Sequence, residues 1–231
     1  MNSKIHLKVT GILLILAPII FMTAFTLLQI NFEYPDILRQ PAAIVMEKFV
    51  AGGSGLIVNW YLMVISSILF IPISVMLHPY LARDDTSYMP LATTFGVIAG
   101  VVQMLGFIRW TFLVPTLAST YLNPSTSEAT RAAIEVTFVA FNQYAGVGIG
   151  EQLGYIFTAL WTILISLAMP KSKYFRPWLG WMGVALAFGI LLGTLEPIGV
   201  PFVGLINAIA YSLWAVWIVI LGVRLLAQKG G

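Results

Sequence analysis

Six long apolar runs, separated by shorter and more polar connections, set the pattern of this chain. Each run is close to the ~20 residues that an α-helix needs to cross the hydrocarbon core of a bilayer. The apolar residues are continuous rather than alternating, and backbone groups in lipid must bond within their own segment, so helices are favoured over a barrel. The pattern predicts an all-α, polytopic membrane protein, one domain over residues 1–231, with transmembrane helices at 8–29, 55–78, 90–113, 151–169, 178–196 and 203–225.

Two longer connections, residues 30–54 and 114–150, each contain an amphipathic pattern. In the first, Pro41 starts a short helix whose apolar face carries Ala42, Val45, Met46 and Phe49. In the second, Ser127 caps a helix that runs through Asn142, with an apolar face of Ile134, Phe138 and Phe141. We expect two outer-side amphipathic helices that lie over the mouth of the bundle or in the membrane interface.

The distribution of Lys and Arg predicts the orientation of the chain. Apart from Arg109, the three basic residues of one side are Arg39, Lys48 and Arg131. The other side carries eight, namely Lys4, Lys8, Arg83, Lys171, Lys173, Arg176, Arg224 and Lys229. This excess predicts a multi-pass protein of the cell inner membrane with both termini in the cytoplasm, and the long apolar run after Lys4 and Lys8 indicates a retained helix rather than a cleaved signal.

Composition narrows the chemistry. The chain is 59% hydrophobic and 9% charged, with a net charge of only +3, which argues against nucleic acid as a partner and favours membrane lipids. It has no cysteine, and only His6 and His78 supply imidazole. No metal site or cofactor is therefore predicted, and no catalytic or nucleotide-binding fingerprint is present.

Arg109, Glu151 and Glu196 are single charges within long apolar stretches. Counting 1.5 Å per residue from the predicted cytoplasmic ends places all three, together with Asn59, roughly 27–29 Å up. Asn207 falls close behind, and Gln103 lies about 9 Å deeper than Arg109. Polar residues near 28 Å are leaving the ~30 Å core, so an interfacial position explains the asparagines. It explains the charges less well, because their flanks are apolar.

Under an apolar cap, the three charges would share a pocket of low dielectric constant in which Arg109 pairs with Glu151, Glu196 or a ligand. A functional pocket and a structural ion-pair lock are both open at this point. Of the two carboxylates, Glu196 is predicted to donate or relay a proton, since Pro197 and its neighbours offer little solvation.

The segment 142–155 is the densest polar element of the sequence. Gly146, Gly150 and Gly154 form a small-residue ridge that lets another helix approach closely. If the segment is α-helical throughout, its other face carries Tyr144, Glu151 and Tyr155. Asn142 begins it, and Trp60 on an earlier helix is expected to add to the pocket wall.

One string in this region, Asn142-Gln143-Tyr144 followed by Gly150-Glu151-Gln152-Leu153-Gly154-Tyr155 and continuing to Thr162, resembles the uncharacterised bacterial integral-membrane family called domain of unknown function 4386. The six-span layout agrees with that family over nearly the full chain. The resemblance implies a protein of a bacterial or archaeal cell membrane. It implies no reaction, ligand or catalytic residue.

Three functional hypotheses follow. The first is a pocket, open to the outer leaflet, that binds a lipidic or amphipathic small molecule, with Arg109 on its anionic part and Glu151 and Glu196 setting the charge. The second is a membrane-embedded enzyme that uses Glu196 or Glu151 as acid or base on a hydrophobic substrate. The third is an assembly subunit whose glycine faces, Gly146 to Gly154 or Gly189 to Gly193, are buried against another chain. Transport ranks lower, because neither an inverted repeat nor a polar path to the cytoplasm is visible.

Overall fold

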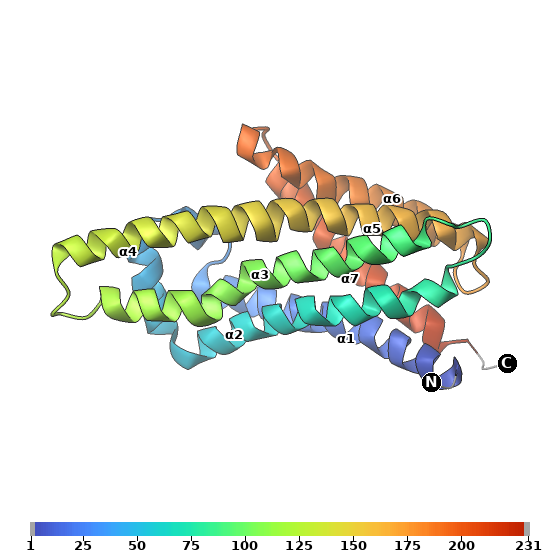
Figure 1. Cartoon of the computed structure of the whole chain (residues 1–231), viewed down its shortest axis with the longest axis horizontal. Coiled ribbons are helices and arrows are strands. Elements are labelled where there is room, and N and C mark those ends of the chain that lie inside the picture. The colour runs from blue at the N-terminus through green and yellow to red at the C-terminus, as the bar shows by residue number, and fades with distance from the viewer. Residues whose placement is uncertain (1–2, 229–231) are drawn as a thin grey trace.

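The computed structural model describes residues 3–228, and helices make up almost all of it (Figure 1). Short 3₁₀ segments join or extend the long helices, and one segment, η3, is a π-helix. In chain order the elements are α1 (Ser3–Phe32), η1 (Asp36–Arg39), α2 (Ala42–Leu77), η2 (His78–Tyr80), α3 (Met89–Tyr121), α4 (Glu128–Phe141), η3 (Asn142–Leu153), α5 (Gly154–Ala168), η4 (Met169–Lys171), α6 (Pro177–Leu192), η5 (Gly193–Ile198) and α7 (Val203–Leu226).

Six helical stretches of the described chain are long and apolar enough to cross a membrane, which confirms the predicted all-α, six-span fold. Four of them match the predicted runs to within a few residues at most ends. The other two are much longer, because Ala42–Tyr80 and Glu128–Lys171 each join an amphipathic segment to a transmembrane segment.

The start of α1 and the end of α7 lie side by side at one end of the bundle (Figure 1). A β-carbon built at Gly11 in α1 would lie 2.7 Å from the side chain of Leu226 in α7. We call this the terminal end and the opposite one the distal end. Lys229, which was counted for the orientation, lies outside the described residues.

The first predicted amphipathic helix forms the beginning of α2. It is separated from the spanning part at Gly53, whose φ of 57° and ψ of −154° are non-helical. Its predicted apolar face of Ala42, Val45, Met46 and Phe49 is buried as expected. That face packs in one cluster with Trp60, Trp110, Ile134 and Phe138. The short helix therefore covers the distal ends of α3 and of the spanning part of α2.

The second predicted amphipathic helix begins where expected, since Ser127 Oγ accepts a hydrogen bond from the backbone N–H of Thr130 at 3.2 Å. It does not lie across the mouth of the bundle, however. α4 continues through η3 into α5 as one helix, because nothing in the glycine-rich stretch stops it (Figure 1). Ile134 and Phe138 are buried, whereas Phe141, which we placed on the apolar face, is 46% exposed.

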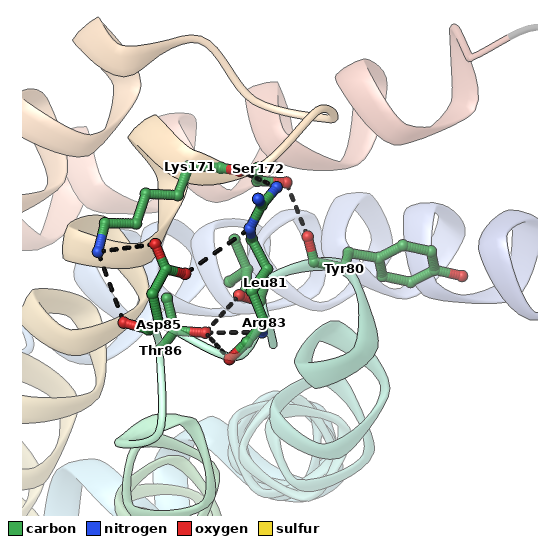
Figure 2. A network of polar contacts seen from close by, with 7 residues as sticks. All are labelled: Tyr80, Leu81, Arg83, Asp85, Thr86, Lys171 and Ser172. Atoms are coloured by element: carbon green, nitrogen blue, oxygen red, sulfur yellow. Dashed lines mark hydrogen bonds and ion pairs between the residues drawn. The ribbon is translucent and has the colours of Figure 1, made fainter.

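At the terminal end, the two loops that join neighbouring spans are held together by a polar network (Figure 2). Asp85 pairs with Lys171 at 3.2 Å and with Arg83 at 3.7 Å. Arg83 Nη1 donates to the carbonyl of Lys171, and Ser172 Oγ donates to the carbonyl of Tyr80, each at 2.7 Å. The network fixes the loop between α2 and α3 against the loop between α5 and α6.

In the distal half, α3 and η3 approach each other closely at a pair of glycines. A β-carbon built at Gly106 would lie 2.7 Å from the Cα of Gly150, and one built at Gly150 would lie 2.9 Å from the Cα of Gly106. Both obstacles are backbone atoms, so neither can rotate away. The two glycines therefore set the distance between these helices.

We predict that Gly106→Ala destabilises the protein by about 1–3 kcal/mol, the usual cost of forcing an extra methyl into a packed contact. Gly55→Ala is the matched control, because a β-carbon there meets no heavy atom within 4 Å. The midpoint of thermal unfolding in detergent should fall for the first variant and stay level or rise for the second. Equal midpoints for the two variants would contradict the crossing.

Candidate functional site

A cavity of about 710 Å³ occupies the distal half of the bundle. We call it the distal cavity. Its walls come from the distal halves of α1 and α7, from α3, from η3, and from the loop and 3₁₀ turn at residues 34–39. Its polar and charged lining residues include Tyr34, Arg39, Gln103, Arg109, Asn142, Glu151, Tyr155, Glu196, Asn207 and Tyr211.

Arg109 reaches the cavity from α3 and is held by uncharged groups. Its Nη2 donates to Asn142 Oδ1 at 3.0 Å, and its Nη1 donates to the carbonyl of Gly106. The guanidinium also lies 5.3 Å from the ring centroid of Trp110. Among the described residues no carboxylate oxygen lies within 4.0 Å of it, so the expected contact ion pair with Glu151 or Glu196 is not formed.

The position of the guanidinium depends on Gly146. A β-carbon built there would lie 2.7 Å from Arg109 Cζ and would collide with Nη2. The predicted glycine ridge therefore packs inside the chain, with Gly146 against Arg109, Gly150 against Gly106 and Gly154 against Gln103. No partner chain is needed to cover this face.

Glu151 lines the distal cavity from η3 and is only partly exposed. Within the described part of the chain, its carboxylate accepts no hydrogen bond and has no cation within 4.0 Å. Arg109 is nevertheless close enough to act on it electrostatically. The cavity thus contains two opposite charges that face one volume without touching.

Glu196 lies at the rim rather than in a buried site. Its Oε1 pairs with Arg39 Nη2 at 3.1 Å, and its side chain is 45% exposed. The expectation that Glu196 is the poorly solvated proton donor is therefore wrong. The chain after Leu192 tightens into the 3₁₀ turn η5 and reaches the loop that carries Arg39, which the apolar flanks of Glu196 did not reveal.

Three phenols line the cavity together with Glu151: Tyr34, Tyr155 and Tyr211. Burial raises the pKa of Tyr34 above its ordinary value, and the nearby Glu151 raises it further, while Arg109 acts in the opposite direction. The Tyr34 hydroxyl therefore stays protonated and available as a donor at neutral pH.

Seven of the ten residues predicted for the site line the distal cavity: Gln103, Arg109, Asn142, Glu151, Tyr155, Glu196 and Asn207. Two of these are engaged in the wall, since Gln103 Nε2 donates to Thr158 Oγ1 at 2.9 Å and Asn207 Nδ2 donates to the carbonyl of Ile190 at 2.7 Å. Five of the seven come from the depth count, and Asn142 and Tyr155 come from the analysis of the segment 142–155.

Asn59, Trp60 and Tyr144 do not line the cavity. Asn59 and Trp60 are buried in the helix-packing region, where Trp60 stacks on Trp110 with ring centroids 4.6 Å apart. Tyr144 is 72% exposed. Its placement beside Glu151 assumed α-helical geometry, whereas a π-helix has more residues per turn, so side chains seven positions apart no longer overlie one another.

Tyr34, Arg39 and Tyr211 were not predicted. Tyr34 and Arg39 belong to a connection that we treated only as a cap, and Tyr211 lies in an apolar run with no neighbouring charge. Tyr211 lies four residues, about one helical turn, beyond the predicted Asn207, and this spacing was the available signal.

The distal cavity is open along one side. Leu205, Ala208 and Ser212 of α7 line it and are themselves exposed, as are Arg39 and Pro197 at the rim.

A second cavity of about 50 Å³ lies next to the distal cavity and shares Phe21, Gln103 and Tyr211 in its lining. The rest of its lining consists of Ser66, Ser67 and apolar residues of α1, α2 and α7. Both linings are mainly apolar, and the polar and charged side chains belong mostly to the larger cavity.

The family described as Domain of unknown function (DUF4386) matches residues 9–228, which is almost the whole chain. The chain belongs to this family. No curated protein and no solved structure shows a significant match. Membership of DUF4386 agrees with the six apolar helices and assigns no ligand or reaction to the distal cavity.

We predict that the distal cavity admits water-soluble reagents. Because the chain has no cysteine, single-cysteine variants need no prior substitutions. A charged, membrane-impermeant thiol reagent should label Gln103→Cys much faster than Asn59→Cys, since Gln103 lines the cavity and Asn59 is buried outside it. Labelling rates in detergent measure this by mass spectrometry, and equal rates would show that the cavity is closed to water.

Proposed function

We propose that this membrane protein binds a lipidic or amphipathic small molecule in the distal cavity, with the anionic part of that molecule on Arg109. One observation carries the proposal. A guanidinium has five N–H donors and a permanent charge, yet Arg109 meets only a carbonyl and an amide oxygen in the described structure. Its charge has no counter-ion in contact, and a ligand phosphate or carboxylate supplies one.

The shape of the cavity supports an amphipathic ligand. Its volume is within the 300–1,000 Å³ typical of small-molecule sites. Phe21, Met22 and Phe25 provide apolar wall opposite the polar residues of η3, and the exposed residues of α7 mark a lateral opening within a spanning helix. An amphipathic ligand fits this lining if its polar group lies in the distal cavity and its alkyl chain leaves between α1 and α7.

We further propose that the distal end faces outward from a bacterial inner membrane, with both termini in the cytoplasm. The basis is the eight-to-three distribution of Lys and Arg. The terminal end contains Arg83 and Lys171 in its loop network, while Arg39 and Lys48 belong to the distal end. The distal cavity then opens toward the outer leaflet.

A membrane-embedded enzyme is the second candidate function, and the geometry favours Glu151 over Glu196 for it. A general acid or base must face a cavity of substrate size and must not be locked to another charge. Glu151 meets both conditions, whereas Glu196 is paired with Arg39. Recovery of a chemically altered form of a bound amphiphile, lost in Glu151→Gln, would favour this function over binding alone.

The third hypothesis, an assembly subunit, has less support. The Gly189–Gly193 face packs on α7, since β-carbons built there would meet Ala210 and Asn207. Together with the ridge on η3, both glycine faces considered for a partner chain are covered within the monomer. An oligomer would have to use another face.

We predict that Arg109→Gln weakens the binding of dodecyl phosphate by about tenfold to a hundredfold, the range expected for one charge-assisted contact. Arg39→Gln is the matched control, because Arg39 is 69% exposed at the rim and already paired with Glu196. Isothermal titration calorimetry in a neutral detergent measures both affinities. An unchanged affinity for Arg109→Gln would refute the proposal.

A second variant keeps the charge of Arg109 but displaces its guanidinium. Gly146→Ala should push the guanidinium off η3 and weaken dodecyl phosphate binding, although Arg109 itself is intact. Gly148→Ala on the same element should have little effect, because the nearest atom to a β-carbon there is the Gln143 carbonyl at 3.4 Å. Equal affinities in the two variants would show that the position of Arg109 does not matter.

A further inference from the structure

We infer that the ligand is zwitterionic: its polar end carries an ammonium group in addition to the anionic group, and Glu151 with its surrounding tyrosines binds that ammonium. The inference rests on the proposed function, since it takes the anionic group to lie on Arg109. It adds the chemical class of the headgroup, which the composition of the chain does not indicate.

The first support is the state of Glu151. A carboxylate that is largely removed from water is costly unless a cation or several hydrogen bonds compensate it. In the described structure Glu151 accepts no hydrogen bond and touches no cation, although it borders a cavity large enough for a ligand. A primary ammonium has three donors and one positive charge, which is what this carboxylate lacks.

The second support is that Arg109 is kept away from Glu151. Asn142 and the carbonyl of Gly106 accept hydrogen bonds from the guanidinium, and it lies against Gly146. The two charges act on each other but remain more than 4.0 Å apart across a shared cavity. Arg109 and Glu151 are thus held apart as a positive and a negative group. They complement a ligand whose anionic and cationic groups are separated by a few bonds.

The third support is aromatic. Tyr34, Tyr155 and Tyr211 line the same cavity as Glu151. Tyr155 and Tyr211 lie with ring centroids 5.6 Å apart, and Tyr34 is held edge-on against Trp60 at 5.3 Å. Aromatic faces beside a carboxylate are the surroundings that attract an organic cation.

The remaining charges at the cavity do not offer an equivalent site. Glu196 is neutralised by Arg39, and Arg39 also lies 3.4 Å from Asp36 at the exposed rim. A purely anionic ligand on Arg109 would meet the unpaired Glu151 carboxylate and be repelled by it. The arrangement therefore selects for a ligand that brings its own cation.

The test compares two dodecyl phosphodiesters that differ only in the ammonium group, dodecylphosphoethanolamine and dodecyl ethyl phosphate. We expect the wild-type protein to bind dodecylphosphoethanolamine at least about tenfold more tightly, since a buried charge-assisted contact contributes a difference of this order. Glu151→Gln should abolish the preference, because it removes both the partner of the ammonium and the carboxylate that repels a purely anionic ligand. Glu196→Gln is the control and should retain the preference.

The outcomes separate this inference from the proposed function. Equal affinities for the two amphiphiles in the wild type, or a preference that survives in Glu151→Gln, would overturn the inference while leaving the Arg109 site standing. If the wild-type protein bound neither amphiphile, the inference and the proposed function would both be overturned. The wild-type comparison alone decides the matter if Glu151→Gln fails to fold, and competition by soluble phosphoethanolamine then distinguishes a free headgroup from a lipid as the source.

Discussion

The close approach of Gly106 and Gly150 is the contact on which the distal half of this protein depends. Because neither residue has a side chain, α3 and η3 meet almost backbone to backbone. On the same line of contact Gln103 lies against Gly154 and Arg109 lies against Gly146. A single glycine ridge therefore sets the distance between the helices and also fixes the side chain of Arg109, one of the two arginines that line the cavity.

η3 contributes polar residues to the cavity lining, and aromatic residues of α2 and α3 pack into a cluster nearby. η3 is a π-helix of 12 residues, a form that usually occurs in short stretches and often at functional sites. It turns Glu151 toward the cavity and Tyr144 away from it. Behind α3, the stacked rings of Trp60 and Trp110, with Phe32, Phe49 and Phe138 around Trp110, form a tightly packed cluster. Arg109 precedes Trp110 in α3 and so lies next to this cluster.

Counting residues along each span was enough to bring Arg109, Glu151, Glu196 and Asn207 to one level, because helical rise is nearly constant. It was not enough to tell which of them touch. Glu196 pairs with Arg39, a residue of a loop more than 150 positions earlier, and Arg109 pairs with an amide rather than a carboxylate. Level along the membrane normal is a one-dimensional property, whereas contact also depends on the rotation of each helix and on the path of the loops.

Long apolar runs and one distinctive string of residues were enough to predict the all-helical fold, the six spans and the family. Residue counts along the spans were enough to predict that charges would gather in the distal half. The folded chain adds two facts about its described residues: Arg109 and Glu151 line one cavity without an ion-pair partner, and three tyrosines from distant parts of the chain line it with them. The reason is physical: hydropathy records the solvent around a segment, but the partner of a buried charge is chosen by helix packing, which no single segment contains.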